Sequence, residues 1–363
     1  MRKSLHLSLL ALALCCIAAD WRVAEPGWDY DFPRDHRIHP EFKTEWWYFT
    51  GNVAGEGGQR FGYELTFFRH GITPLAQRDT NASRFVVGDL KFAHFAITDV
   101  AKQRFRFEQK ISRGAFGEAG FNDGKRLAWI DDWTLATNGD DEFELVATMK
   151  EGATLHLHLR ATKPPVIHGQ GGVSTKASGD GHASHYYSMT RLETTGEFFA
   201  GGKSQAFRGE SWFDHEWATN QLAPGQVGWD WLSVQFDDGS ELMLYQMRLE
   251  NGSADPASSG TLVAVDGAST HLPSSSFQMT PTDYWKSDRS GAKYPIGWRV
   301  DLPEHGLRFT VRAAVENQEL SFPPLVYWEG SIEVSGTRAG QPITGRGYLE
   351  LTGYAGPLRE LQR

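Results

Sequence analysis

The hydrophobic residues of this chain alternate with polar ones in short runs, and this pattern constrains the fold more than any other feature. Runs such as "LHLHL" (155–159) and "GWDWLSVQF" (228–236) are separated by glycine, aspartate and asparagine. A period of two is typical of a half-buried β-strand, and hardly any stretch shows the 3.6-residue period of a helix. The sequence therefore predicts an all-β fold.

Turn residues divide this pattern into hairpins. Residues 46–70 predict two strands joined by a glycine-rich turn, and residues 228–252 predict a hairpin around Asp-Asp-Gly-Ser. Residues 168–184 contain too much glycine and serine for a core strand and predict a long loop. So many antiparallel strands must stack as sandwiches or close into barrels to hide their edges. We expect two units of barrel length, residues 20–205 and residues 206–363.

The first nineteen residues have the features of a secretory signal. Two basic residues precede an apolar run at 5–17, and two alanines end the segment before Asp20. We expect cleavage there and a periplasmic or secreted protein. The run is shorter than the roughly 18–20 residues that span a bilayer, so no integral membrane segment is predicted. Both cysteines, Cys15 and Cys16, lie in this segment, and because Leu14 precedes them a lipid anchor is disfavoured.

Charge and composition restrict the kinds of partner. The chain has 36 basic and 45 acidic residues, a net charge of -9 and no basic stripe, which argues against nucleic acid. Aromatic residues make up 13% of the chain, which favours a bulky apolar small molecule or an aromatic-rich core. No phosphate-binding loop, dinucleotide fingerprint or G-x-S-x-G elbow is present, so we expect no cofactor.

The stretch "ESWFDHEWA" (210–218) carries the densest set of ionisable and aromatic residues. If it is a strand, His215 and Trp217 share one face while Asp214 and Glu216 share the other, unless a bulge or bend intervenes. Two interpretations remain open. Either His215 and Trp217 face a ligand cavity, or these aromatic and polar residues form a hydrogen-bonded core between two barrels.

Three further positions have a structural interpretation. Glu64 and Arg69 lie on one expected strand, and Glu45 lies on the strand before it. A carboxylate and a guanidinium on adjacent strands predict a buried ion pair in the first barrel. His94 alternates with apolar residues and is expected to be a hydrogen-bonded core histidine.

A metal site is not predicted. His156 and His158 share one face of a strand, which is the geometry of two metal ligands. However, Thr154 and Arg160 extend the same face, so a solvated strand face is expected.

Eight segments, in order, resemble one family. They are "HPEFKTEWWYFTGNV", "YELTFFRHGI", "AHFAITD", "YYSMTRL", "WFDHEWATNQL", "GWDWLSVQFDDGSELMLYQMR", "YWEGSIEVSG" and "GYLELTGY". Together they are similar to the carotenoid 1,2-hydratase and AttH-like superfamily of exported proteins. The resemblance implies two lipocalin-like (calycin) antiparallel β-barrels packed side by side, with a large hydrophobic substrate enclosed near their junction.

The same resemblance implies a site. The hydratases of the family carry a His-x-Trp, matched here by His215 and Trp217, and a Tyr-x-Asp that appears as Tyr245-x-Met247. The acid is therefore missing at position 247. His215, Asp214, Asp230 and Glu241 are the available substitutes.

The leading hypothesis is an exported, cofactor-independent hydro-lyase of the carotenoid 1,2-hydratase type, which adds water to or rearranges a C=C bond in a polyene, terpenoid or lipid-like substrate. The expected catalytic residues are His215, Asp214 and Tyr245; the expected substrate-binding residues are Trp217, Trp229, Asp230 and Trp231; the expected structural residues are Glu45, Arg69 and His94. The alternative, favoured by Met247, is a non-catalytic periplasmic carrier of lipids or hydrophobic metabolites that contacts an ABC-type export machine.

Overall fold

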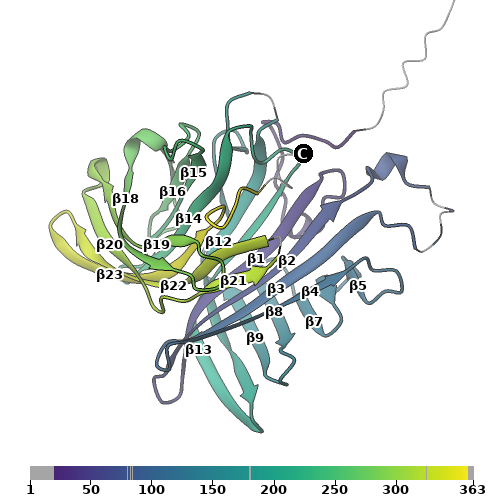
Figure 1. The fold of residues 1–363 in the computed structure, drawn as a ribbon, viewed down its shortest axis with the longest axis horizontal. Helices are drawn as coiled ribbons and strands as arrows, with labels where there is room; N and C mark the ends of the chain where they lie inside the picture. Colours follow the sequence, from purple (N-terminus) through teal and green to yellow (C-terminus); the bar gives the residue numbers. More distant parts are fainter. Residues whose placement is uncertain are drawn as a thin grey trace, which may run out of the picture.

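The computed structural model describes residues 20–79, 81, 83, 85–179, 181–323 and 325–358, and these form two antiparallel sheets (Figure 1). The predicted signal segment lies outside the described residues. Helical structure in the described part of the chain consists of four short 3-10 turns, η1 (Arg34–His36), η2 (Leu75–Gln77), η3 (Ser274–Ser276) and η4 (Pro303–His305). The all-β prediction is confirmed. The described residues contain no helix of the length and apolarity needed to cross a bilayer.

The first sheet has the strand order β4-β3-β2-β1-β13-β12-β9-β8-β7-β6-β5, and β10 and β11 pair with β12. Its strands are β1 (Thr44–Gly55), β2 (Arg60–Gly71), β3 (Asp89–Asp99), β4 (Arg104–Ser112), β5 (Ala119–Phe121), β6 (Arg126–Ile130), β7 (Trp133–Thr137), β8 (Glu142–Thr148), β9 (Thr154–Ala161), β10 (Val166–Ile167), β11 (Ser174–Thr175), β12 (Ala183–Ala200) and β13 (Lys203–Ala218).

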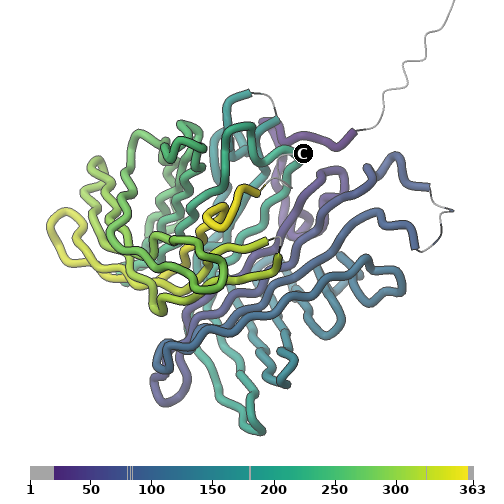
Figure 2. Tube along the Cα trace, viewed as in Figure 1, coloured from purple at the N-terminus to yellow at the C-terminus, as the bar shows by residue number. Residues whose placement is uncertain are grey.

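The second sheet has the order β17-β16-β15-β14-β23-β22-β20-β19-β18, and β21 pairs with β22. Its strands are β14 (Gln226–Phe236), β15 (Glu241–Leu249), β16 (Ser259–Val263), β17 (Ser269–Pro273), β18 (Gln278–Lys286), β19 (Lys293–Leu302), β20 (Leu307–Ala313), β21 (Glu319–Phe322), β22 (Leu325–Arg338) and β23 (Gln341–Leu351). In Figure 2 the purple-to-teal part of the trace forms one body and the green-to-yellow part the other.

Each sheet curls around its own apolar core. The first core takes side chains from strands along the whole sheet, including Trp47, Trp133 and Phe213, and the second does so with Leu232, Trp298 and other buried residues. The two-barrel prediction is therefore confirmed. Alternating sequences give alternating burial, because successive side chains of a strand point to opposite faces.

The hairpins predicted from turn residues are confirmed. Residues 46–70 form β1 and β2, and residues 228–252 contain the β14–β15 hairpin. The expected division at residues 205 and 206 falls inside β13, whose whole length pairs with β1 and β12 in the first sheet. The change of sheet lies between Ala218 and Gln226. The glycine-rich loop precedes β12 in the sequence and lies alongside it, and the short strands β10 and β11 pair with β12.

The barrels pack face to face across β1, β2, β12 and β13 on one side and β14, β15, β22 and β23 on the other. Gly62 permits the close approach, because a Cβ atom there would lie 2.6 Å from the Cβ of Ser331. Asn52 donates to the carbonyl of Gly347 at 3.1 Å, and Gln235 donates to the carbonyl of Ser211 at 2.9 Å. These contacts fix the position of one barrel against the other.

Candidate active site between the two barrels

A third apolar cluster lies between the barrels and is separate from both cores. It is rich in aromatic and sulfur side chains, and it consists of Tyr48, Tyr186, Trp212, Leu222, Trp231, Met243, Tyr245, Met247, Tyr348 and Leu358. Trp46, Trp229 and Leu325 pack against it and are only partly buried. These three mark the side of the cluster that meets solvent.

Three glutamates from three strands enter this cluster. Glu64 comes from β2, Glu329 from β22 and Glu350 from β23, and the Cα atoms of Glu329 and Glu350 are directly paired across the two strands. Glu64 and Glu329 are buried, whereas Glu350 keeps some exposure. Like charges directly opposite each other destabilise a sheet. An ionised pair is therefore unfavourable here.

Burial is the main cause of the shifted pKa values of these glutamates. It raises the pKa of Glu64 to about 8 and that of Glu350 to about 7. It also raises the pKa of Glu329 well above its usual value, and the charges of Glu64 and Glu350 add to that rise. Desolvation and like charges both favour the neutral acid. Protonated carboxyl groups are thus available between the barrels near neutral pH.

Several polar atoms in the same place have no hydrogen bond to the described residues. They are the hydroxyl groups of Tyr48 and Tyr348, Oε2 of Glu64 and Oε1 of Glu329. Tyr48 and Glu329 nevertheless lie close enough to alter each other's pKa. Buried polar atoms are nearly always paired, and unpaired ones concentrate where a protein binds water or a ligand. These atoms identify the interface as a candidate site.

Asp214 enters the interface from β13 at the centre of a hydrogen-bond network. Its carboxylate accepts from the hydroxyl of Tyr186 at 2.7 Å, from Nε1 of Trp212 at 2.5 Å and from the hydroxyl of Ser188. Trp231 donates in turn to the Tyr186 hydroxyl at 3.0 Å. Burial raises the pKa of Asp214 to about 7 in spite of these donors. The structure therefore brings together Asp214 and Trp231, two of the residues singled out in the sequence.

Trp229 and Met247 form the neighbouring part of the interface. Their Cα atoms are paired across β14 and β15, and Nε1 of Trp229 donates to Oε2 of Glu350 at 3.0 Å. The position where the resemblance implied an acid thus holds a buried methionine. The glutamate that contacts Trp229 comes instead from β23.

The glycine-rich loop closes one side of the interface. Nζ of Lys176 lies 3.1 Å from Oε1 of Glu216 and 4.0 Å from the centre of the Tyr245 ring. The Tyr245 hydroxyl donates to the carbonyl of Thr175 at 2.8 Å and accepts from Ser259 at 2.8 Å. Tyr245 therefore lies in the interface, with its hydroxyl bonded to the loop.

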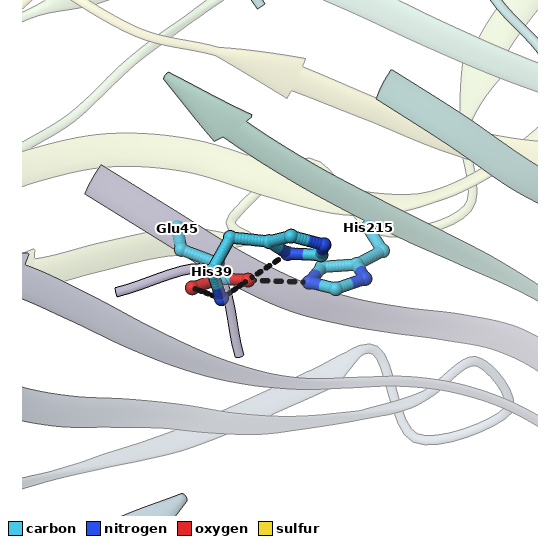
Figure 3. Close-up of side chains that lie close together, drawn as sticks. All are labelled: His39, Glu45 and His215. Atoms are coloured by element: carbon cyan, nitrogen blue, oxygen red, sulfur yellow. Dashed lines mark hydrogen bonds and ion pairs between the residues drawn. The ribbon is translucent and has the colours of Figure 1, made fainter. Parts of the chain in front are cut away.

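His215 and Trp217 lie on the other face of β13, inside the first barrel. The pairing of β13 with β1 runs without a bulge from Phe207 to Ala218, so the predicted alternation of faces holds. The predicted catalytic set is consequently divided, because His215 cannot act beside Asp214. Nε2 of His215 lies 3.0 Å from Oε1 of Glu45, and Oε1 lies 2.8 Å from Nδ1 of His39 (Figure 3).

Charged neighbours control ionisation in this second group. Burial alone would raise the pKa of Glu45, but His215, His39 and Arg69 together lower it well below its usual range. Burial lowers the pKa of His39, and hydrogen bonds to Asp35 and Glu45 reverse this and raise it. Nε of Arg69 lies 3.3 Å from Oε2 of Glu45. The Glu45–Arg69 pair predicted from the sequence is present.

Three other predicted residues bond to groups outside the apolar interface cluster, although Glu241 and His94 also lie between the barrels. Asp230 is buried on the opposite face of β14 from its neighbours Trp229 and Trp231; it accepts from Arg248, and from the Tyr354 hydroxyl at 2.9 Å. In contrast, Glu241 pairs with Lys163 and Arg191 at 2.7 and 2.6 Å and links the barrels. His94 lies 2.5 Å from the Tyr327 hydroxyl. These three side chains have hydrogen-bond or ion-pair partners of their own.

Sequence reasoning missed the glutamate cluster. Glu64 was grouped with Arg69, but the two are five residues apart on one strand and face opposite ways. Glu329 in "YWEG" and Glu350 in "YLEL" are single acids among apolar residues of buried strands. An acid on a strand that is otherwise buried on both faces is the signal that could have identified them.

Two lipocalin-like barrels with buried carboxyl groups between them define an all-β protein with an enclosed polar interface. A sequence model of the AttH-like family matches residues 23–354. The chain is 32% identical to a candidate AttH from Nitrosomonas europaea of known crystal structure, with a TM-score of 0.82 over 92% of this chain and 99% of that one. The chain belongs to the AttH-like family.

Two fungal proteins are more distant. Kievitone hydratase from Nectria haematococca has a similar fold, with a TM-score of 0.70 and 13% identity over 90% of this chain and 93% of that one. The dehydratase AsqC of Emericella nidulans is 21% identical over 273 residues, which is 70% of this chain and 75% of that protein.

Proposed function

We propose that this protein is a cofactor-independent hydro-lyase that adds water to, or removes it from, a C=C bond of a bulky apolar molecule held between the barrels. The observation that carries the proposal is the set of carboxyl groups with raised pKa among aromatic rings, led by Glu350 and Glu329. The names of two relatives, a hydratase and a dehydratase, support the same reaction class.

The chemistry requires an acid, a base and a surface that tolerates a cation. A neutral Glu350 donates its proton to one alkene carbon, and the π electrons form the new C–H bond. The cation left on the other carbon lies against ring faces such as those of Trp229 and Trp231, which stabilise positive charge by about 0.5–2 kcal/mol each. Water then forms the C–O bond and gives a proton to a carboxylate. Dehydration is the reverse sequence.

Glu350 is our choice for the acid because of its accessibility and its neighbours. It is the partly exposed member of the glutamate cluster, and Trp229 fixes one of its oxygens. Glu329 lies opposite, and two carboxyl groups at this distance do not both ionise, so one of them keeps a proton. After Glu350 has donated its proton, its carboxylate is the base that accepts a proton from water. Asp214 and Tyr186 position the nearby Trp231.

The substrate class follows from the lining of the interface. Large aromatic and methionine side chains favour a polyene, terpenoid or lipid-like molecule, and a carotenoid end group is one such substrate. Export to the periplasm, as the first nineteen residues suggest, is part of the same proposal.

Deuterium exchange tests the proposal on any apolar ligand that is found bound to the purified protein. This ligand is identified by native mass spectrometry and is then incubated with the protein in deuterium oxide. Reversible hydration exchanges hydrogen at the protonated carbon or gives a product heavier by one water, and Glu350→Gln abolishes both changes. A ligand recovered without deuterium or added water from the wild-type protein would instead indicate the non-catalytic carrier.

A further inference from the structure

A second group of ionisable side chains, which the proposed reaction does not use, converges inside the first barrel. Nδ1 of His39 lies 2.8 Å from Oε1 of Glu45, and Nε2 of His215 lies 3.0 Å from the same oxygen. One donor atom from each residue lies within 4.8 Å of the other two. Figure 3 shows the two rings meeting at the carboxylate, from β13 and from the segment before β1.

Asp35 contacts the outer nitrogens of both rings, and the Tyr187 hydroxyl also lies 3.2 Å from the outer nitrogen of His215. Nδ1 of His215 lies 2.8 Å from the Asp35 carbonyl oxygen, and Nε2 of His39 lies 3.4 Å from Oδ1 of Asp35. Metal-bound histidines almost always donate their second ring N–H to a carbonyl or carboxylate, which fixes the tautomer and the ring orientation. Without a metal ion, the inner nitrogens hydrogen-bond to Oε1 of Glu45. A bound ion would displace the protons on these nitrogens, while the outer nitrogens go on donating to Asp35.

Packing holds the three ligand groups rigidly. The His39 ring is stacked on Trp217 with ring centres 3.8 Å apart, and the His215 ring is stacked on Trp47 at 4.7 Å. The other oxygen of Glu45 accepts from the His39 backbone N–H at 2.9 Å and from Arg69. Rings and carboxylate thus cannot rotate away from one another without disturbing the core.

A route from solvent to this group exists. A cleft of about 470 Å³ opens beside the N-terminal segment, and its lining includes Trp28, Asp35, Ile38 and His39. His39 belongs both to this lining and to the buried group. An ion that enters the cleft therefore meets His39 first, with Glu45 and His215 buried behind it.

We propose that His39, Glu45 and His215 bind a divalent transition-metal ion, with Zn²⁺ as the best match. Two imidazole nitrogens and one carboxylate are a ligand set that Zn²⁺ favours. The ion joins the segment at residues 35–39 to β1 and β13, so its role is to fix the N-terminal segment over the end of the first barrel. This inference departs from the expectation of no metal, and it is independent of the hydro-lyase proposal.

Metal titration of the purified full-length protein tests the site. After treatment with a chelator, the protein is titrated with Zn²⁺ by calorimetry and with Co²⁺ by visible absorption, and bound metal is measured by atomic emission. We expect one equivalent to bind and the thermal midpoint to rise with free Zn²⁺. His39→Gln and His215→Gln should each lose the buried Co²⁺ absorption. Asp35→Ala should weaken Zn²⁺ binding about 10- to 100-fold, because it removes the carboxylate that positions His39.

A second group of side chains supplies the matched control. Glu144, His156 and His158 also lie within ligand distance of one another, but on the solvated face of the paired strands β8 and β9. The double variant His156→Gln/His158→Gln should keep the Zn²⁺ equivalent and the Co²⁺ absorption. Loss of binding in this variant, or retention of binding in a folded His39→Gln protein, would overturn the assignment, as would failure of the wild-type protein to bind either ion. His39 lies at the edge of the cleft, so its variant serves if His215→Gln does not fold.

Discussion

Asp214 and His215 are adjacent in the sequence, and their side chains lie on opposite sides of the first sheet. Asp214 faces the second barrel and bonds to Tyr186, while His215 faces the interior of the first barrel and contacts Glu45. A single strand therefore serves two chemically separate groups. Substitutions at the two positions should have different effects.

Asp214→Asn should impair turnover more than stability. The amide removes an acid whose pKa is about 7 and gives the Tyr186 hydroxyl a poorer partner, so turnover should fall at least about tenfold while unfolding changes by about 1–2 kcal/mol. His215→Gln should destabilise the protein by about 1–3 kcal/mol, because it removes a buried hydrogen bond to the Glu45 carboxylate, and leave turnover nearly unchanged. Urea denaturation measures the stability of each variant, and conversion of a bound apolar ligand measures its turnover. The opposite pattern would place catalysis inside the first barrel.

Glu350→Gln should separate catalysis from folding at the interface. Turnover should fall about 100-fold or more, because a general acid is removed. Stability at about pH 8 should stay the same or rise, because the neutral amide avoids burying an ionised carboxylate beside Glu329. Kinetic and denaturation measurements on the same preparation check both parts. An active, destabilised variant would contradict the assigned role.

The free energy of unfolding should fall as the pH rises through neutrality. In the folded state the pKa values are raised to about 8 for Glu64 and to about 7 for Glu350 and Asp214, from usual values of 4.5 or 3.8. The folded state therefore binds these protons more tightly than the unfolded state does. The resulting stabilisation is fully present below the pKa of the unfolded state and is lost as the pH rises through the pKa of the folded state. Between about pH 5 and about pH 8 we expect a loss of at least about 2 kcal/mol.

Urea denaturation across this range measures the effect. The double variant Glu64→Gln/Glu350→Gln should flatten the curve, since two of the titrating groups are gone. A wild-type stability that increases over the same interval would mean that these carboxyl groups are ionised in the folded protein.

Met247→Leu should leave activity within a few-fold of the wild type. Met247 is buried beside Trp229, and the substitution nearly conserves its volume, so the cost should be below about 1.5 kcal/mol. If the acid is Glu350, position 247 needs only an apolar side chain. Steady-state kinetics measure this, and a loss of activity comparable to that of Glu350→Gln would assign a chemical role to the sulfur.

Lys176→Met should destabilise the glycine-rich loop and the interface together. The change leaves Glu216 buried without its cation, at a cost of about 3 kcal/mol or more. Adding Glu216→Gln should restore much of that loss. A double-mutant cycle measured by urea denaturation gives the interaction energy, and additive effects would show that the pair contributes nothing.

The fold was predictable because its determinants are local. Alternation and turn residues define the hairpins at 46–70 and 228–252, and the same alternation separates Asp214 from His215. The position where the chain passes from the first sheet to the second is not determined by local sequence. The expected division at residue 205 ignored the pairing of β13 with β1, which joins segments far apart in the sequence and depends on tertiary packing.

The glutamate cluster was beyond sequence reasoning for a related reason. Glu64, Glu329 and Glu350 meet only after both barrels have closed and docked, and each is the only buried or partly buried acid in its own strand. Which face of a doubly buried strand meets the second barrel cannot be read from a period of two. Trp231 was predictable because its strand follows the motif that carries Asp214 in the sequence, and Tyr245 because the family resemblance singled out its position.

The unbroken pairing of β13 with β1 has an evolutionary consequence. His215 and Trp217 contact the N-terminal segment, so changes there must fit that segment, whereas even-numbered positions such as Asp214 face the second barrel and can adapt to a new substrate. Point substitutions therefore allow two independent lines of divergence along one strand. A single-residue insertion ahead of Trp212 would reverse this parity and disable both sides at once.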